Sequence, residues 1–209
     1  MARPASDIRH RLIVSARARF LSEGVDGASL RQIAKEAGTN IGMVYYYFKT
    51  KDELFLAVVQ DVYGDLLADM ERSLSAAGTE QQQFQLLYER ISRLSDEELQ
   101  VIRMLMREAL VSSPRLRGLA ELFLRGHIPL LLGHLARGIE AGRVRDDLPP
   151  TLLLGATLVL GIMPQIVRRS VGPLDPRLDA LLPRPEQIAH GMADILFHGI
   201  SQPKAADES

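Results

Sequence analysis

The residues from Ser29 to Phe55 carry the chemistry of nucleic-acid recognition rather than that of catalysis. Their sequence is SLRQIAKEAGTNIGMVYYYFKTKDELF. Hydroxyl, amide and ammonium groups, which hydrogen-bond to phosphates and base edges, alternate here with the apolar positions of two short helices. The turn Gly38-Thr39-Asn40 separates these helices, and its glycine stands where the first helix must end. This spacing predicts a helix-turn-helix, whose second helix enters the major groove of DNA.

The polar residues around the second short helix have distinct predicted roles. Thr39 and Asn40 are expected to cap the helix and to face the bases, and Gly42 lets the backbone approach DNA without a side chain in between. Lys49 and Lys51 follow the helix. Lys51 falls in the first turn of the next helix, where free N–H groups also favour a phosphate.

The aromatic run of the second helix divides between core and surface. Val44 and Phe48 are four residues apart and are expected in the core. Tyr45, next to Val44, is predicted to face inward, and Tyr46 and Tyr47 to face outward with hydroxyls near phosphates. The predicted DNA-binding residues are Ser29, Arg31, Thr39, Asn40, Ile41, Gly42, Tyr46, Tyr47, Lys49 and Lys51.

The charge distribution agrees with a polyanion-binding N-terminal part. Residues 1–51 contain nine Lys or Arg against four acidic residues, a balance of +5, although the whole chain has a net charge of −1. The remainder therefore carries −6. A basic module joined to an acidic body suits a protein that binds nucleic acid at one end.

Catalytic and metal sites are not indicated. The chain has no cysteine, which excludes disulfides, thiolate ligands and cysteine nucleophiles and fits a reducing cytoplasm. His127 and His134 are seven residues apart, about 10 Å along a helix, which is too far for one ion. His190 and His198 are also mismatched. No phosphate-binding glycine loop, H-E-x-x-H or G-x-S-x-G motif occurs, so we expect no enzyme, no cofactor and no metal.

Helical periodicity covers almost the whole chain and predicts an all-α protein of about nine helices. Gly24 is expected to end the first helix, and Ser29, Thr50, Thr79 and Ser95 each begin a capping-box pattern. Pro129 is expected to kink or split a helix over 115–142. The other late helices are predicted at about 80–94, 97–111, 150–170 and 185–199.

Membrane insertion and secretion are not expected. The N-terminus carries charge where a signal peptide needs an apolar core. The longest apolar stretch, Leu152 to Pro164, is about 13 residues, whereas a bilayer span needs roughly 20. We therefore expect a buried helix there and a cytoplasmic protein.

The first quarter of the chain resembles the DNA-binding domain of TetR-family transcriptional regulators. The family pattern F-x-x-x-G matches Phe20 to Gly24, and S-x-x-x-I-A-x-x-A-G matches Ser29 to Gly38. The final part, G-x-x-Y-x-x-F-x-x-K-x-x-L, is matched in order by Gly42, Tyr45, Phe48, Lys51 and Leu54. Two positions depart from the pattern, because Ile41 replaces a commonly polar residue and Arg19 a frequently apolar one. Ile41 is expected to contact a thymine methyl instead, and Arg19 to reach phosphate or solvent.

The resemblance implies a three-helix DNA-binding domain over residues 1–52 and a larger helical domain over 53–202 that binds an effector and dimerises. Residues 203–209 are expected to form a flexible tail. The family favours repression from a palindromic operator, with activation left open as the alternative. The mostly apolar residues of the middle helices suit a small, mostly apolar effector that releases the protein from DNA. The two-fold dimer would use the last two long helices.

Two residue sets follow for the larger domain, and plain core is the alternative for each: it is favoured for the effector-binding set, whereas the dimer is favoured for the second set. The effector-binding set is Leu87, Met104, Leu105, Glu108, Phe123, His127, Met163 and Gln165. The dimer set is Leu152, Gly155, Val159, Ile162, Ile166, Ile188, Met192 and Ile195. A helical enzyme and an interaction protein without DNA binding remain as alternatives, and a gel shift would separate both from a regulator.

Overall fold

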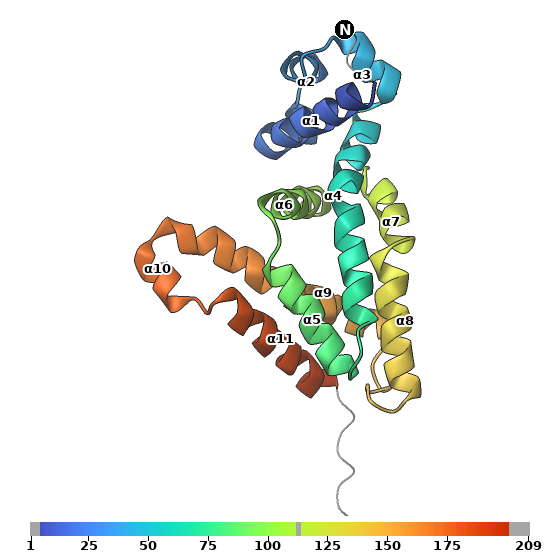
Figure 1. Ribbon diagram of the computed structural model, residues 1–209, viewed down its shortest axis with the longest axis vertical. Helices are drawn as coiled ribbons and strands as arrows, with labels where there is room; N and C mark the ends of the chain where they lie inside the picture. Colours follow the sequence, from blue (N-terminus) through green and yellow to red (C-terminus); the bar gives the residue numbers. More distant parts are fainter. Residues whose placement is uncertain (1–4, 112–113, 201–209) are drawn as a thin grey trace, which may run out of the picture. The chain divides into compact units, whose positions relative to one another are not determined.

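The computed structural model describes residues 5–111 and 114–200, and every regular element in these ranges is helical (Figure 1). This confirms the all-α prediction. In chain order the elements are α1 (Ala5–Gly27), α2 (Leu30–Glu36), α3 (Ile41–Tyr47), α4 (Lys51–Leu74), α5 (Glu80–Ser92), α6 (Asp96–Leu110), α7 (Leu116–Leu124), α8 (His127–Glu140), α9 (Pro150–Val171), the 3-10 turn η1 (Gly172–Leu174), α10 (Pro176–Leu181) and α11 (Pro185–Ile200).

The structure has eleven α-helices within the described ranges, against about nine expected, for two local reasons. The predicted helix over 115–142 is divided between Leu124 and His127, shortly before Pro129. Proline is tolerated at the third position of α8 because the first N–H groups of a helix have no intrahelical acceptor. The second addition is α10, where the Asp175 side chain accepts a hydrogen bond from the Arg177 N–H at 2.7 Å and caps a short helix.

The helices form two compact units. One contains the chain up to Leu66 and the segment Ser95–Leu122; the other contains Leu67–Leu94 and the chain from Phe123 onward. The boundary predicted after residue 52 falls inside the first of these units, because α6 and the beginning of α4 pack there with α1. The helices α4 and α7 each contribute to both units.

The core of the first unit begins with the predicted apolar stripe of α1. Leu12, Ala16 and Phe20 are four residues apart and at most 1% exposed. The Phe20 ring meets the Phe55 ring of α4 edge-on, with 6.1 Å between centroids. Regular winding of α1 is interrupted at Gly24, whose φ of 77° is a left-handed conformation that glycine adopts without a Cβ penalty. The expected helix end at Gly24 is therefore present as a break, after which one further turn follows.

The four predicted capping boxes differ in outcome. Thr79 and Ser95 form complete boxes, with both reciprocal hydrogen bonds present. Thr50 forms half of one: its hydroxyl accepts from the Glu53 N–H at 3.0 Å, while the Glu53 carboxylate binds the N–H of the preceding residue. Ser29 is the N-cap residue of α2 but its side chain makes no capping hydrogen bond, so that prediction is wrong.

In the second unit α11 packs against α5 and α9, and α9 also packs against α5 and α8. The Tyr88 side chain of α5 is 1% exposed, and its hydroxyl donates to the Thr157 carbonyl of α9 at 2.8 Å. Burial raises the pKa of this phenol above its ordinary value. Beside it, Gly161 permits the close approach, because a Cβ at that position would lie 2.7 Å from Tyr88 Cε1.

The apolar composition of this segment predicts a buried helix, but α9 is only partly buried. Pro150–Leu174 is 25 residues long and contains an 18-residue apolar window with a mean hydropathy of 1.7, of which 33% is buried. The length test applied to Leu152–Pro164 alone therefore undercounts the segment, which by length and composition alone could cross a membrane. This is weak support for a membrane span, because core and interface helices of non-membrane proteins pass the same test.

We predict that Gly161→Ala destabilises the protein by about 1–2 kcal/mol. The added methyl overpacks against the fixed Tyr88 ring, which costs about 1–3 kcal/mol, and the better helix propensity of alanine offsets part of this. Gly64→Ala is the matched control, since Gly64 lies in the interior of α4 and a Cβ there would have no atom within 4 Å. That variant should be about 0.5–1 kcal/mol more stable. Urea denaturation at equal protein concentration measures both, and equal shifts in the two variants would contradict the packing of α5 on α9.

Candidate nucleic-acid interface

The turn between α2 and α3 is closed by two backbone hydrogen bonds around a left-handed glycine. The Gly38 N–H donates to the Lys35 carbonyl at 3.1 Å, and the Thr39 N–H donates to the Ala34 carbonyl at 2.9 Å. Gly38 itself has φ 65°. This is the Schellman pattern of a helix C-terminus, and it satisfies carbonyls that would otherwise lack a partner. The predicted helix-turn-helix spacing thus has a local physical cause.

Asn40 is the residue that begins α3. Its backbone is extended (φ −117°, ψ 165°), and its Oδ1 accepts a hydrogen bond from the Met43 N–H at 3.2 Å. Thr39, which we expected to share the cap, is half-buried and lies one position before it. Gly42 serves this cap, because a Cβ there would lie 3.0 Å from the Asn40 Oδ1. Asn40 keeps its amide N–H groups for a further partner, since the cap uses only its oxygen.

The two faces of α3 correct one prediction about the tyrosines. Val44 and Phe48 are 1% and 4% exposed and form the buried side. Tyr45 is 56% exposed and Tyr46 76% exposed, so Tyr45 does not face inward. The reason is helical geometry: a residue directly after a buried one lies about 100° around the helix, whereas Tyr47, three after Val44, returns toward the buried side. Tyr47 is accordingly half-buried, and its ring centroid lies 5.0 Å from that of Tyr46.

The first turn of α4 is tied to the end of α1. Lys51 is half-buried, and its Nζ donates to the Asp26 carbonyl at 2.9 Å. One of the three ammonium protons is engaged in this bond. The Glu53 carboxylate accepts a hydrogen bond from the Lys49 N–H at 2.8 Å. This backbone donor is therefore not available to a phosphate.

The guanidinium of Arg115 links several chain segments around the first turn of α4. Arg115, at the start of α7, has a side chain 7% exposed and donates to three carboxylates: Asp26 at 2.9 Å, Asp52 at 3.0 Å and Glu108 at 2.8 Å. Burial by itself lowers the pKa of Arg115, but the hydrogen bonds of Asp26, Glu108 and Asp52 outweigh it and raise the pKa above its ordinary value. In turn Arg115 holds the pKa of the Asp26 carboxyl below its usual range.

All ten predicted DNA-binding residues lie in the first unit, on or beside α2, α3 and the start of α4. Exposed among them are Arg31, Asn40, Gly42, Tyr46 and Lys49; half-buried are Ser29, Thr39, Ile41, Tyr47 and Lys51. Arg19 was expected to reach phosphate or solvent, but its guanidinium donates hydrogen bonds to Glu36 and Glu23. Tyr45 was missed as a surface residue, although the 3.6-residue period counted from Val44 and Phe48 would have found it.

The predicted effector-binding residues are divided between the two units. Met104, Leu105 and Glu108 belong to the first, and Leu87, Phe123, His127, Met163 and Gln165 to the second. Glu108 is 4% exposed and paired with Arg115, and Met163 is exposed on α9. The ring centroids of Phe123 and His127 are 4.9 Å apart. Burial lowers the pKa of His127 to about 4, which keeps this side chain neutral at pH 7. Gln165 is 1% exposed and donates to the Pro185 carbonyl at 3.1 Å.

The predicted dimer residues occupy different environments on α9 and α11. Leu152, Val159 and Ile195 are more than half exposed. Gly155, Ile162 and Met192 are half-buried, whereas Ile166 and Ile188 are at most 9% exposed and belong to the core of the second unit. Met163 and Val167 continue the exposed line of Leu152 and Val159 along α9, although neither was in the predicted dimer set.

Residues 12–58 match the family model described as "Bacterial regulatory proteins, tetR family". Among curated proteins the chain is 25% identical over 158 residues to the fatty acid metabolism regulator protein of Bacillus subtilis, covering 74% of this chain and 79% of that protein. It is 24% identical over 144 residues to the transcriptional activator FasR of Mycolicibacterium smegmatis, covering 68% of this chain and 66% of that one.

Solved structures of the same fold include bacterial regulators with ligands. The regulator FadR of Bacillus subtilis in complex with stearoyl-CoA has a TM-score of 0.73 at 20% identity, with 91% of this chain and 98% of that chain covered. SmeT, the repressor of a Stenotrophomonas maltophilia multidrug efflux pump, has a TM-score of 0.63 at 20% identity, with 97% and 96% covered. These similarities concern the fold, and the similar proteins are regulators rather than enzymes.

We predict that two substitutions at Asn40 separate its capping role from DNA contact. Asn40→Asp keeps the capping oxygen, so thermal stability should stay within about 0.5 kcal/mol of wild type, whereas Asn40→Ala should lose about 1 kcal/mol. Both remove the amide donor and should weaken DNA binding, the aspartate by about tenfold or more because it adds negative charge beside the phosphates. Fluorescence anisotropy with a duplex selected by the wild-type protein measures this. Full DNA affinity in Asn40→Asp would show that the amide contacts no DNA.

Proposed function

Because the chain is a TetR-family transcriptional regulator, we propose that it binds a palindromic operator as a homodimer, represses transcription there, and is released by a small, mostly apolar effector. It acts in the cytoplasm, without a membrane partner. The observation that carries the proposal is α3, a capped helix whose buried side is Val44 and whose other side exposes tyrosines and the Asn40 amide.

DNA contact by this surface combines two kinds of group. Asn40 and Tyr46 are exposed at the start and outer side of α3, where they can reach base edges in a major groove. Arg31 and Lys49 are exposed cations that pair with phosphates and fix the orientation of the protein on the duplex. Lys51 is held against the end of α1 by its bond to Asp26, so its remaining ammonium protons have a defined position.

We predict that Lys51→Met weakens binding to all duplexes alike and lowers the slope of log affinity against log salt by about one phosphate contact. The control is Arg177→Met on α10, which removes one positive charge from a side chain that is 90% exposed. That control should leave the slope unchanged. Anisotropy titrations over a range of salt concentrations measure both variants, with thermal unfolding to verify the fold. An unchanged salt slope in Lys51→Met would remove this residue from the phosphate contacts.

Dimerisation is proposed on the exposed side of α9. Leu152, Val159, Met163 and Val167 fall on one side of the helix and are 56%, 57%, 37% and 45% exposed. A contiguous apolar surface of this kind is typical of a protein interface. Gly155 has open space where a side chain would be, which permits close approach of a helix from a second copy. Ile195 of α11, the other helix of the predicted interface, is 52% exposed.

We predict that Val159→Glu converts the dimer into monomers. A carboxylate placed near the two-fold axis would be buried without a partner in both copies, a mechanism that costs several kcal/mol. Leu181→Glu on α10 is the control, since Leu181 is 80% exposed and lies outside this surface. Sedimentation equilibrium measures the change. A dimer that persists in Val159→Glu would exclude this side of α9 as the interface.

The effector is proposed to be apolar because of the ligands bound by similar proteins. One is stearoyl-CoA in the FadR complex, and another is triclosan in a complex of SmeT. Both carry a large apolar part. The coupling to DNA is proposed to run along α4, a single helix that begins with Lys51 and contributes to both units.

We predict that an effector and operator DNA weaken each other's binding by the same factor, between about fivefold and 150-fold. The probes are stearoyl-CoA and triclosan, titrated by calorimetry into the free protein and into the protein bound to its selected duplex. A probe that binds both forms with equal affinity is not an effector. If this holds for both probes while DNA binding is intact, the proposed release by apolar compounds of these kinds fails.

A further inference from the structure

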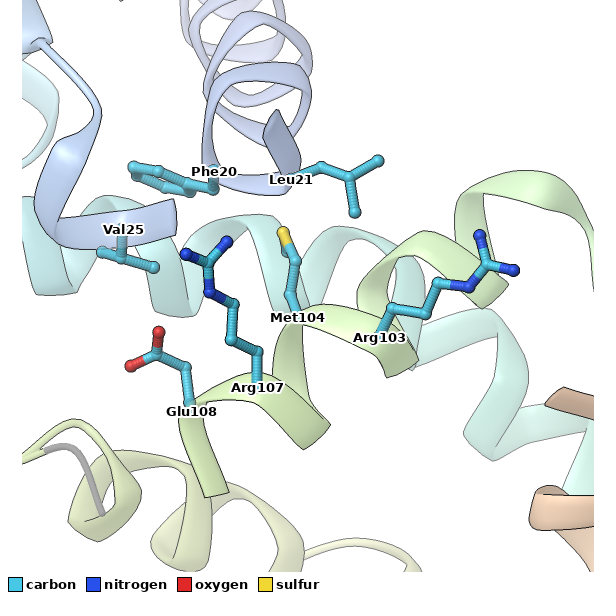
Figure 2. A pocket seen from close by; sticks show the side chains of 7 residues that line it. All are labelled: Phe20, Leu21, Val25, Arg103, Met104, Arg107 and Glu108. Carbon is cyan, nitrogen blue, oxygen red and sulfur yellow. The ribbon is translucent and has the colours of Figure 1, made fainter. Parts of the chain in front are cut away.

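A pocket lies within the first unit, between α1 and α6. It has a volume of about 140 Å³ and is lined by Phe20, Leu21, Val25, Arg103, Met104, Arg107 and Glu108, as Figure 2 shows. A cavity of this size in a protein accommodates a molecule as large as benzene. All seven residues belong to the same compact unit as the DNA-binding residues.

The inner wall of the pocket is apolar and firmly placed. Phe20, Val25 and Met104 are at most 3% exposed, so their positions are set by the packing of the unit. In Figure 2 these side chains approach one another from α1 and α6, with the Arg107 guanidinium beside them. A thioether and an aromatic ring offer good contacts to a flat apolar ligand.

The charge at the pocket comes from Arg107. Its side chain packs over Gly24, where a Cβ would lie 2.9 Å from Nη2 and 3.0 Å from Cζ. The absence of a side chain at Gly24 therefore leaves space for the Arg107 guanidinium and also allows the left-handed backbone with φ 77°. Across the ranges 5–111 and 114–200, no carboxylate forms an ion pair with Arg107, and the residue is exposed. An accessible guanidinium beside an apolar wall is suited to bind a carboxylate.

The lining contains two other charged residues. Arg103 is a second arginine of the lining and has an interaction partner of its own. Glu108 is the acidic residue of the lining; it is paired at 2.8 Å with Arg115, which also pairs with Asp26 and Asp52. The apolar wall and the Arg107 guanidinium together suit a small anion with an apolar body rather than a cation or a sugar.

Glu108 connects the pocket to the DNA-binding residues through a series of hydrogen bonds. Arg115, which binds Glu108, also binds Asp52 in the first turn of α4 and Asp26 at the end of α1. The main-chain carbonyl of Asp26 in turn accepts from the Lys51 Nζ. An anion beside Glu108 repels that carboxylate and competes for the same cations, so its binding shifts the Arg115 ion pairs that include Asp26, the residue whose carbonyl binds Lys51.

We propose that the α1–α6 pocket is a second ligand site, which takes a small carboxylate with a benzene-sized apolar body and thereby changes DNA affinity. The ligand class differs from that of the apolar effector proposed above, and of the predicted effector-binding set Met104 and Glu108 line this pocket. The effect on DNA affinity rests on the proposed function, whereas binding of the carboxylate does not.

The experiment titrates the full-length protein with benzoate and, separately, with benzyl alcohol, followed by NMR of methyl-labelled methionine. Saturable benzoate binding is expected below about 10 mM, the range for a ligand of so few atoms. Benzyl alcohol should bind about tenfold more weakly. Arg107→Gln should abolish that preference, and Arg117→Gln, an arginine of α7 outside the lining, should retain it. Leu21→Trp, which fills the pocket, should weaken both ligands.

Each result supports or overturns one part of the proposal. Equal affinity for benzoate and benzyl alcohol, or an unchanged preference in Arg107→Gln, overturns the carboxylate site, as does the absence of saturable benzoate binding. A second arm measures affinity for a random-sequence duplex with benzoate or with sodium chloride at equal ionic strength. A change specific to benzoate and lost in Arg107→Gln supports the link to DNA, and no change overturns that link. A protein that binds no duplex refutes the proposed function while the NMR titration still decides the site.

Discussion

The pairing of Glu108 with Arg115 is the interaction on which the organisation of the first unit depends. A carboxylate that is 5% exposed needs a cation beside it, because an unpaired buried charge costs several kcal/mol. Arg115 meets this need through Nε and uses Nη1 and Nη2 for Asp52 and Asp26. Its planar fork thereby fixes four chain segments in one geometry: the ends of α1 and α6 and the starts of α4 and α7. Such a cluster specifies a geometry more than it adds stability, since apolar residues of similar size would often be equally stable there.

The same unit carries groups whose placement serves binding rather than folding. Tyr45 and Tyr46 expose large aromatic rings to solvent, and Arg107 lies beside an apolar pocket without an acidic partner in the described part of the chain. These exposed groups are therefore accessible to a binding partner. On α9 the exposed apolar side has the same character, because covering it with a second copy removes Val159 and its neighbours from water.

The fold narrows the function without identifying the ligand. Proteins with this architecture include one in complex with stearoyl-CoA and one in complex with triclosan, at identities near 20%. Helical bodies of this type bind different compounds because the lining side chains change while the helix packing persists. The chemistry of individual residues, such as the Arg107 guanidinium without an acidic partner in the ranges described, is therefore the better guide to what this chain binds.

The sequence by itself determined the helices and the helix-turn-helix, because both depend on local rules. Gly38, the Asn40 cap and the buried pair Val44 and Phe48 are recognisable from residue type and spacing within a few positions of each other. The outward orientation of Tyr45 also follows from the helical period counted from Val44, so it too was predictable. Only the tertiary structure decided that α6 packs with the DNA-binding segment, that Glu108 binds Arg115 instead of a ligand, and that α9 is largely exposed. These depend on contacts between residues such as Asp26 and Arg115, 89 positions apart, which no local period encodes.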